Sequence, residues 1–76
     1  MITVKLYGLL RLDSGIKEKQ LEAATVRQVL DALAEDGIPR KDLDGCVILV
    51  NGRNANKRSK LMSGDRVVLM SPVAGG

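Results

Sequence analysis

The sequence contains no histidine, tryptophan or phenylalanine, one tyrosine (Tyr7) and one cysteine (Cys46). This set lacks the ligands of a zinc site and the base that would activate a serine or cysteine nucleophile. Carboxylates are present, but they fall mostly in expected turns and on the polar face of a helix, where solvated surface is the simpler interpretation. We therefore expect no metal, no bound cofactor and no catalysis by the chain itself.

A single cysteine also excludes an intrachain disulfide, so packing has to stabilise the fold, which suits a reducing cytoplasm. Cys46 begins an apolar run with no basic neighbour in sequence, and a small core residue is the simpler interpretation than a redox thiol. No apolar run reaches the length that crosses a bilayer, and the N-terminus has the pattern of a strand, not of a signal peptide. We expect a cytoplasmic protein with no membrane partner.

Aromatic residues make up only 1% of the chain. A net charge of +3 is compatible with nucleic-acid binding, but the stacking side chains of single-strand binders are missing, and we expect no nucleic-acid partner. The basic residues are scattered except in the run Lys57-Arg58-Ser59-Lys60. A solvated loop is the simplest interpretation of that run, and a contact patch for an acidic partner is the alternative.

The chain does contain 45% apolar and 28% charged residues in 76 positions, the balance of one small globular domain over residues 1–76. Alternation and short apolar runs rich in β-branched residues are typical of strands. We expect strands in the segments 1–7, 16–23, 46–50, 53–56 and 66–70. Asn51-Gly52 predicts a hairpin turn, residues 8–15 can form a helical turn, and residues 40–45 are expected to be a connector.

The clearest helix begins after Thr25, which has the capping-box spacing to Gln28. Apolar residues then recur on one stripe, formed by Val26, Val29, Leu30 and Leu33. Gly37 and Pro39 predict where the helix ends.

This order of elements predicts an α+β fold, the β-grasp or ubiquitin-like roll: a mixed sheet of four to five strands with one main helix on one face. We expect the first and last strands to be parallel neighbours at the centre of the sheet. The residues after the last strand would then project from one end of the sheet.

The third and last strands are apolar on both faces, although one helix covers only one face of a sheet. In the last strand, Val67 and Leu69 alternate with Val68 and Met70, so one pair has to face away from the helix. Bare aliphatic side chains on a small domain indicate a contact surface. Coverage by a loop and self-association are the alternatives.

Residues 71–76 form an expected flexible C-terminal tail. Pro72 ends strand pairing, and the side chains after it are small. Two terminal glycines can enter a narrow channel in another protein and carry the α-carboxylate to a reactive centre. A frayed terminus without function is the alternative interpretation.

Five segments of the chain resemble those of a known family. These segments are Met1 to Tyr7 with Leu10-Arg11, Ala24-Thr25-Val26-Arg27, Val50-Asn51-Gly52, Ser63-Gly64-Asp65-Arg66-Val67 and Pro72-Val73-Ala74-Gly75-Gly76. In this order and over essentially the whole chain they resemble the MoaD/ThiS sulfur carriers. The match is closest to the MoaD type, the small subunit of molybdopterin synthase.

The resemblance implies a carrier protein that is not an enzyme by itself. An E1-like adenylating enzyme of the MoeB/ThiF type would use ATP to adenylate the carboxylate of Gly76, and a sulfur donor would convert the adenylate to a thiocarboxylate. In the MoaD type, the tail then enters the large subunit of molybdopterin synthase (MoaE type), where the sulfur passes to a pterin precursor.

By the same resemblance, Gly76 carries the sulfur, Gly75 gives clearance, and Pro72, Val73 and Ala74 form an extended neck. Tyr7, Arg11 and Met70 match partner-surface positions, and Val68 joins them as a member of the outward set. Edge packing for Tyr7 and a solvated cation for Arg11 are the alternatives.

The chain departs from the family in two ways: Ser71 replaces a second proline, which predicts a less rigid neck, and the chain is basic where MoaD-type carriers are often acidic. Three other functions remain open. They are a sulfur carrier for thiazole, cysteine or a modified nucleoside, a ubiquitin-like modifier of protein lysines, and a plain β-grasp binding module with an incidental tail.

Overall fold

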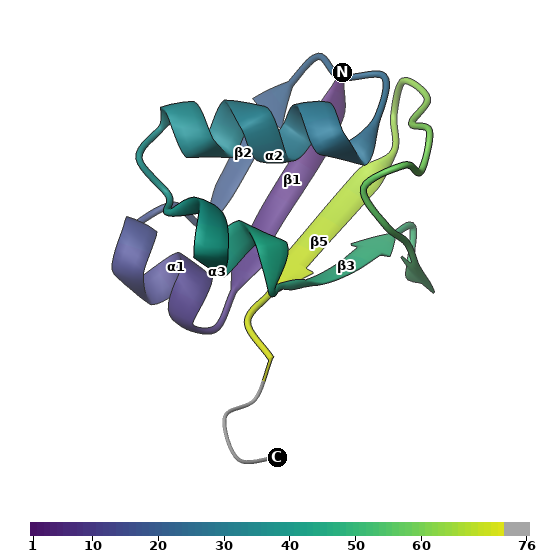
Figure 1. The fold of residues 1–76 in the computed structure, drawn as a ribbon. Coiled ribbons are helices and arrows are strands. Elements are labelled where there is room, and N and C mark those ends of the chain that lie inside the picture. The colour runs from purple at the N-terminus through teal and green to yellow at the C-terminus, as the bar shows by residue number, and fades with distance from the viewer. Residues whose placement is uncertain (73–76) are drawn as a thin grey trace.

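The computed structural model describes residues 1–72, so the predictions for Val73, Ala74, Gly75 and Gly76 lie outside the described residues. Figure 1 shows the arrangement of the helices and strands. The elements in chain order are β1 (Ile2–Tyr7), α1 (Leu9–Ser14), β2 (Glu18–Leu21), α2 (Val26–Glu35), α3 (Arg40–Asp44), β3 (Val47–Val50), β4 (Arg53–Asn54) and β5 (Arg66–Met70).

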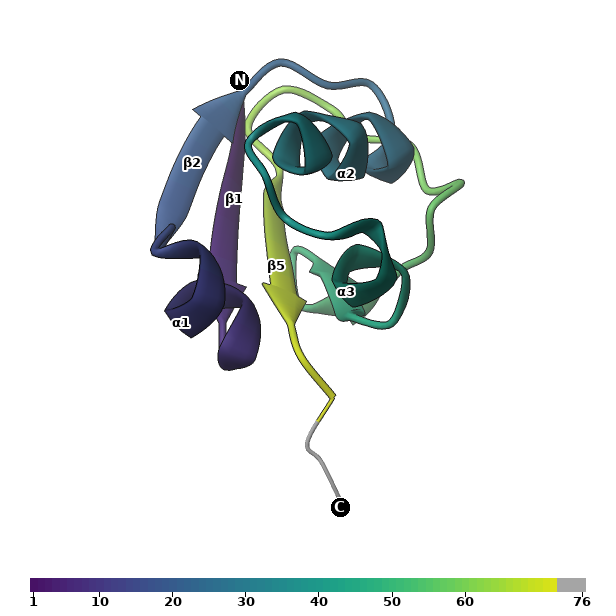
Figure 2. The same cartoon turned by 60° about the vertical axis from the view of Figure 1, so that its left-hand side comes forward.

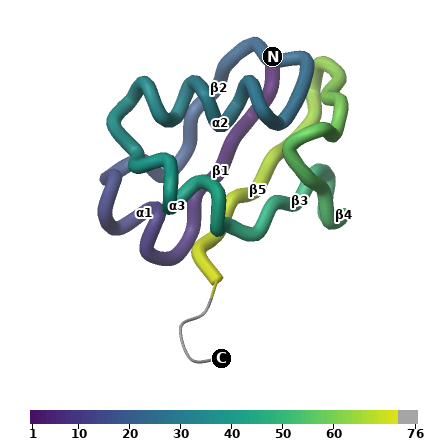
Figure 3. Tube along the Cα trace, viewed as in Figure 1, coloured from purple at the N-terminus to yellow at the C-terminus, as the bar shows by residue number. Residues whose placement is uncertain are grey.

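The strands form one mixed sheet in the order β2-β1-β5-β3-β4, which can be followed in Figure 3. β1 and β5 are parallel neighbours in the middle, and the other pairs are antiparallel. Helices α2 and α3 lie on one side of this sheet (Figure 2). The predicted β-grasp roll, with its first and last strands side by side, is therefore confirmed.

Two details differ from the sequence-based expectation. Residues 40–44 form the short helix α3, not a connector, because Pro39 fixes the backbone ahead of the first turn and Leu43 is anchored in the core at 1% exposure. The second and fourth strands are shorter than predicted, with four and two residues. Both lie at the edges of the sheet, where each has a partner strand on only one side.

Helix α2 begins as its sequence predicts. The Gln28 N–H donates to Thr25 Oγ1 at 3.3 Å, and Gln28 Oε1 accepts from the N–H of Ala24 at 2.6 Å, one residue earlier than a standard capping box. At the other end, Gly37 adopts a φ of +104°, which favours glycine, and the chain leaves the helix. These local signals fix both ends of the element that covers the sheet.

The core lies between α2 and the inner face of the sheet. Within residues 1–72 every buried position is apolar, and the fully buried side chains come mainly from β1, α2 and β5. They are Ile2, Val4, Leu6, Val26, Val29, Leu30, Leu33, Leu43, Val67 and Leu69. Each such burial stabilises the fold by roughly 1.5–3 kcal/mol relative to an exposed side chain. In the part of the chain that is described, no helix is long and apolar enough to span a bilayer.

A hydrogen-bonded turn fixes the start of β5. Asp65 accepts from the N–H of Met62 at 2.9 Å and from the side-chain amide of Asn51 at 3.0 Å. These two hydrogen bonds lower the pKa of Asp65, because they favour its charged form. Asn51 has a φ of +52° and Gly52 a φ of +82°, which is the hairpin turn that Asn51-Gly52 predicts.

The packing of the core predicts that Leu33→Ala lowers the free energy of unfolding by about 2–5 kcal/mol, because it leaves a cavity under α2. Leu12→Ala is the matched control, since Leu12 is 75% exposed, and it should change this free energy by no more than about 0.5 kcal/mol. Urea denaturation followed by circular dichroism measures both. Equal losses in the two variants would contradict the placement of the core.

Candidate functional site

The outer face of the sheet carries a strip of apolar side chains. The strand registers place Tyr7, Met70 and Val47 in one row across β1, β5 and β3, and they place Val68 beside Leu49 in the next row. We call these five residues the outer strip. Val67 and Leu69 are fully buried on the helix side, whereas Val68 and Met70 are half-buried on the outer side. The pair that faces away from the helices is therefore Val68 and Met70.

The outer strip is accessible to solvent. Tyr7 is 43% exposed and Val47 is 39% exposed, values that are high for large apolar side chains in the middle of a sheet. The sequence predicts Tyr7, Val68 and Met70 for this surface but does not single out Val47 and Leu49. Their signal was present in the apolar run of the third strand, but which of its residues face outward depends on the pairing with β5.

Tyr7 and Arg11 lie close together in the structure. With Lys5, Lys17 and Glu18 they line a shallow depression beside β1. Lys5 lies 3.8 Å from Glu18, while Arg11 makes no ion pair among residues 1–72. The depression therefore presents unpaired positive charge next to the outer strip, an arrangement that can receive a carboxylate.

The tail base, which we define as Ser71 and Pro72, leaves β5 at the end of the sheet where Tyr7 and Met70 lie (Figure 1). The N–H of Leu10 donates to Ser71 Oγ at 3.0 Å, so Ser71 is bonded to α1. The prediction that Ser71 makes the neck less rigid missed this contact, because it joins residues 61 positions apart. Pro72 is exposed and borders a cavity of about 250 Å³ that α1 and α3 line.

Cys46 is half-buried and packs against the core, as its sequence context predicts. Its Sγ–H donates to the carbonyl oxygen of Leu43 at 3.0 Å. Burial raises the pKa of the Cys46 thiol, because it disfavours the thiolate. This environment is that of an inert core thiol and not of a reactive one. In the described residues, no group of three or more side chains is placed to hold a metal ion.

The basic run 57–60 is a loop that is hydrogen-bonded to the start of α2, and we call it the brace. The backbone carbonyls of Lys57 and Ser59 accept hydrogen bonds from the first N–H groups of α2, each at 3.0 Å. Lys57 also pairs with Asp44, and this hydrogen bond lowers the pKa of Asp44.

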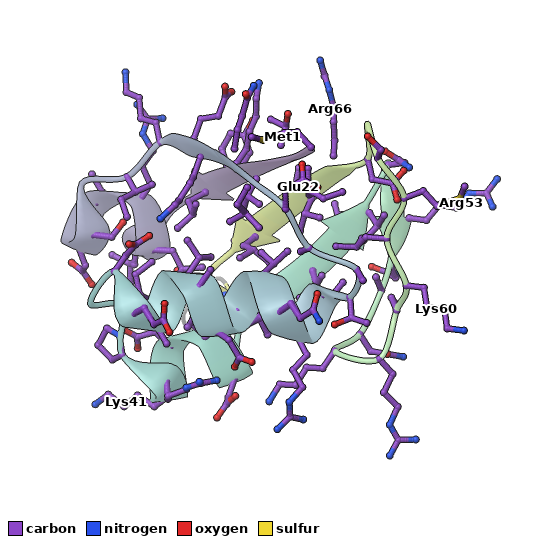
Figure 4. The ribbon with its side chains drawn as sticks, turned by 90° about the horizontal axis from the view of Figure 1, so that it is seen from above. Met1, Glu22, Lys41, Arg53, Lys60 and Arg66 are labelled. Carbon is purple, nitrogen blue, oxygen red and sulfur yellow. The ribbon has the colours of Figure 1, made fainter. Side chains whose placement is uncertain are left out.

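Positive charge is concentrated in one segment of the chain. Residues 51–60 contain four basic and no acidic side chains, while the other residues hold eight basic and nine acidic ones. The excess positive charge of the chain therefore lies at this end of the molecule, where Figure 4 shows Arg53 and Lys60.

The central parallel strand pair, the single long helix and the bare outer face define a β-grasp protein of the ubiquitin-like class. The chain belongs to the ThiS family of ubiquitin-like sulfur carriers, because the family model matches residues 4–76. The resemblance to MoaD/ThiS carriers is thereby confirmed. No curated protein matches the chain.

Solved structures agree with this assignment. The chain is similar to small archaeal modifier protein 1 of Methanosarcina acetivorans, with a TM-score of 0.84, 26% identity, and coverage of 99% of this chain and 95% of that one. It is also similar to the Haloferax volcanii protein of the same name, with a TM-score of 0.81, 27% identity, and coverage of 99% of this chain and 98% of that one. The fold is shared with a chain in a complex of subunits 1 and 2 of the molybdopterin-converting factor from Helicobacter pylori. That chain has a TM-score of 0.75 and 24% identity, with coverage of 99% of this chain and 97% of that one.

The environment of Cys46 predicts slow alkylation. In the folded chain, iodoacetamide should modify Cys46 more slowly than it modifies an unstructured cysteine peptide at the same mildly alkaline pH, because the raised pKa leaves less thiolate and burial restricts access. Mass spectrometry follows the reaction. Unfolding the chain in denaturant should restore the rate of the peptide, and a folded thiol that reacts as fast as the peptide would contradict the assignment.

Proposed function

We propose that this chain is a sulfur carrier for the biosynthesis of molybdopterin. Its Gly76 carboxylate is adenylated by an E1-like enzyme of the MoeB/ThiF type and is then converted to a thiocarboxylate. The observation that carries the proposal is the position of the outer strip, which reaches the same end of the sheet as the tail base. Membership of the ThiS family supports the same chemistry.

The chemistry requires a partner because a free carboxylate is a poor electrophile. ATP, bound by the activating enzyme, supplies an adenylyl group to a carboxylate oxygen, and pyrophosphate leaves. Sulfide released from a sulfur donor then attacks the acyl carbon, the bond between that carbon and the AMP oxygen breaks, AMP leaves with that oxygen, and the thiocarboxylate remains. The carrier contributes the position of the reacting carbon, which makes attack effectively intramolecular within the complex.

The distances of the fold suit this task. Six residues follow Met70 in the sequence, and a chain of that length spans at most about 20 Å when it is fully extended. A partner that binds the outer strip through Met70 and Val68 therefore has the Gly76 carboxylate within reach of an active site near its docking surface. Tyr7 and Arg11 would border the same contact, with Arg11 available for a partner carboxylate.

For delivery, the proposed acceptor complex contains a large synthase subunit of the MoaE type. A ubiquitin-like modifier is the second candidate, and the likeness to two small archaeal modifier proteins at 26–27% identity favours it specifically. Sulfur delivery to thiazole, cysteine or a nucleoside would use the same first two steps. Mass spectrometry separates the two classes, since a carrier exchanges one oxygen for sulfur, whereas a modifier is found on target lysines.

Deletion of Gly76 should abolish adenylation, because the shortened tail can no longer bring its carboxylate to the catalytic centre. The measurement is ATP–pyrophosphate exchange with the E1-like enzymes of the source organism, followed by mass spectrometry of the product. Unfolding curves that match the wild type would show that the deletion leaves the domain intact. Normal adenylation of the shortened chain would instead support a tail without function.

Met70→Asp should lower kcat/KM for adenylation by about tenfold or more, because it places a charge in the centre of the docking surface. Met62→Asp is the matched control, since Met62 is 76% exposed and lies before the turn that starts β5. It should leave kcat/KM within about twofold of the wild type, as expected for a surface position outside the contact. Equal effects of the two substitutions would argue against docking through the outer strip.

A further inference from the structure

Strand geometry brings Ser71 to the first turn of α1. Side chains alternate along β5, so the residue after the outward-facing Met70 points to the helix side. The parallel register pairs Met70 with Tyr7, which places Ser71 beside Gly8, the residue that links β1 to α1. A Cβ built on Gly8 would lie 3.7 Å from the Cβ of Ser71. Figures 1 and 2 show α1 next to the point where β5 ends.

At this point α1 lacks a capping side chain of its own. Its N-cap residue is Gly8, with a φ of +65° and no side chain to accept from the first N–H groups. Ser71 supplies the missing cap: its Oγ accepts from the N–H of Leu10 at 3.0 Å, in a partly buried position. A hydroxyl that satisfies a free N–H of a first helical turn is the ordinary capping interaction, but here it comes from 61 residues away.

The bond acts on a backbone that is already restricted. Pro72 follows directly, and a residue before proline is confined to extended conformations. The hydrogen bond adds a second restraint, since it ties the side chain of Ser71 to α1. Backbone and side chain of Ser71 are therefore both fixed at the last position before the tail leaves the domain.

We propose that Ser71 is a positioning residue, which through its bond to Leu10 sets the direction in which the tail leaves the sheet and so prepares it for entry into the activating enzyme. This role rests on the proposed function. Loss of the bond lets the tail base take other orientations, and only a fraction of the molecules then presents the tail correctly. The apparent affinity for the activating enzyme falls in proportion to the fraction of molecules that present the tail correctly, while the reaction of the correctly bound tail is unchanged.

The test compares Ser71→Ala, which removes the acceptor, with Ser71→Thr, which keeps a hydroxyl, in the adenylation assay. Ser71→Ala should raise the KM for the carrier by about two- to tenfold, the range expected for one net hydrogen bond, with kcat unchanged. Ser71→Thr should return KM toward the wild-type value. Ser63→Ala is the matched control: the Ser63 Oγ accepts from the N-terminal amine at 3.0 Å at the other end of the sheet, and its loss should not change KM.

A second measurement reports on the bond itself. Hydrogen exchange at the Leu10 amide, followed by NMR, should be faster in Ser71→Ala than in the wild type and in Ser63→Ala. An unchanged KM in Ser71→Ala, an unchanged exchange rate, or a Ser71→Thr variant no better than Ser71→Ala would overturn the positioning role. If instead the wild-type chain is not adenylated, the proposed function fails and this role with it, whereas the exchange rate still decides whether the bond exists.

Discussion

The parallel pairing of β1 with β5 is the contact on which the rest of this molecule depends. It places Val4 and Leu6 next to Val67 and Leu69, all fully buried, and so forms the centre of the core. The same register puts Tyr7 next to Met70 on the opposite face. Because parallel strands end at the same edge, α1 and the tail base also emerge together. The buried core, the apolar outer strip and the position of the tail base therefore follow from one pairing.

The two faces of the sheet have separate physical roles. The inner face is covered by α2 and α3, and the burial of its apolar side chains stabilises the fold. The outer strip takes no part in this core and remains accessible, with Tyr7 and Val47 each more than a third exposed. An apolar strip left bare in the free domain is an interface that a partner can bury without any rearrangement of the core.

The chain has no histidine and one cysteine, and both its thiol and its densest basic segment make structural contacts. Its one thiol is hydrogen-bonded to the Leu43 carbonyl with a raised pKa, and its densest basic segment braces the start of α2. The proposed function needs no more than this, because on that proposal the chemistry takes place on a carboxylate that other proteins activate. On the same proposal, the domain contributes a rigid body that holds the tail base at a defined end of the sheet.

The sequence by itself determined the elements whose signals are local: the alternation of β1, the capped and glycine-terminated α2, the Asn51-Gly52 turn and the end of strand pairing before Pro72. The order of these elements was enough for the β-grasp fold. It also showed that β3 and β5 are apolar on both faces, but not that Val47 and Leu49 join Val68 and Met70 outside. The tertiary structure alone decided that choice, the helix α3, the brace at residues 57–60 and the bond from Leu10 to Ser71. The physical reason is range: the outward set depends on strand register, and the brace and the bond to Ser71 join residues far apart in the chain. Pro39 is a local signal for the start of α3, but the helix also depends on the burial of Leu43 in the core, which no local pattern encodes.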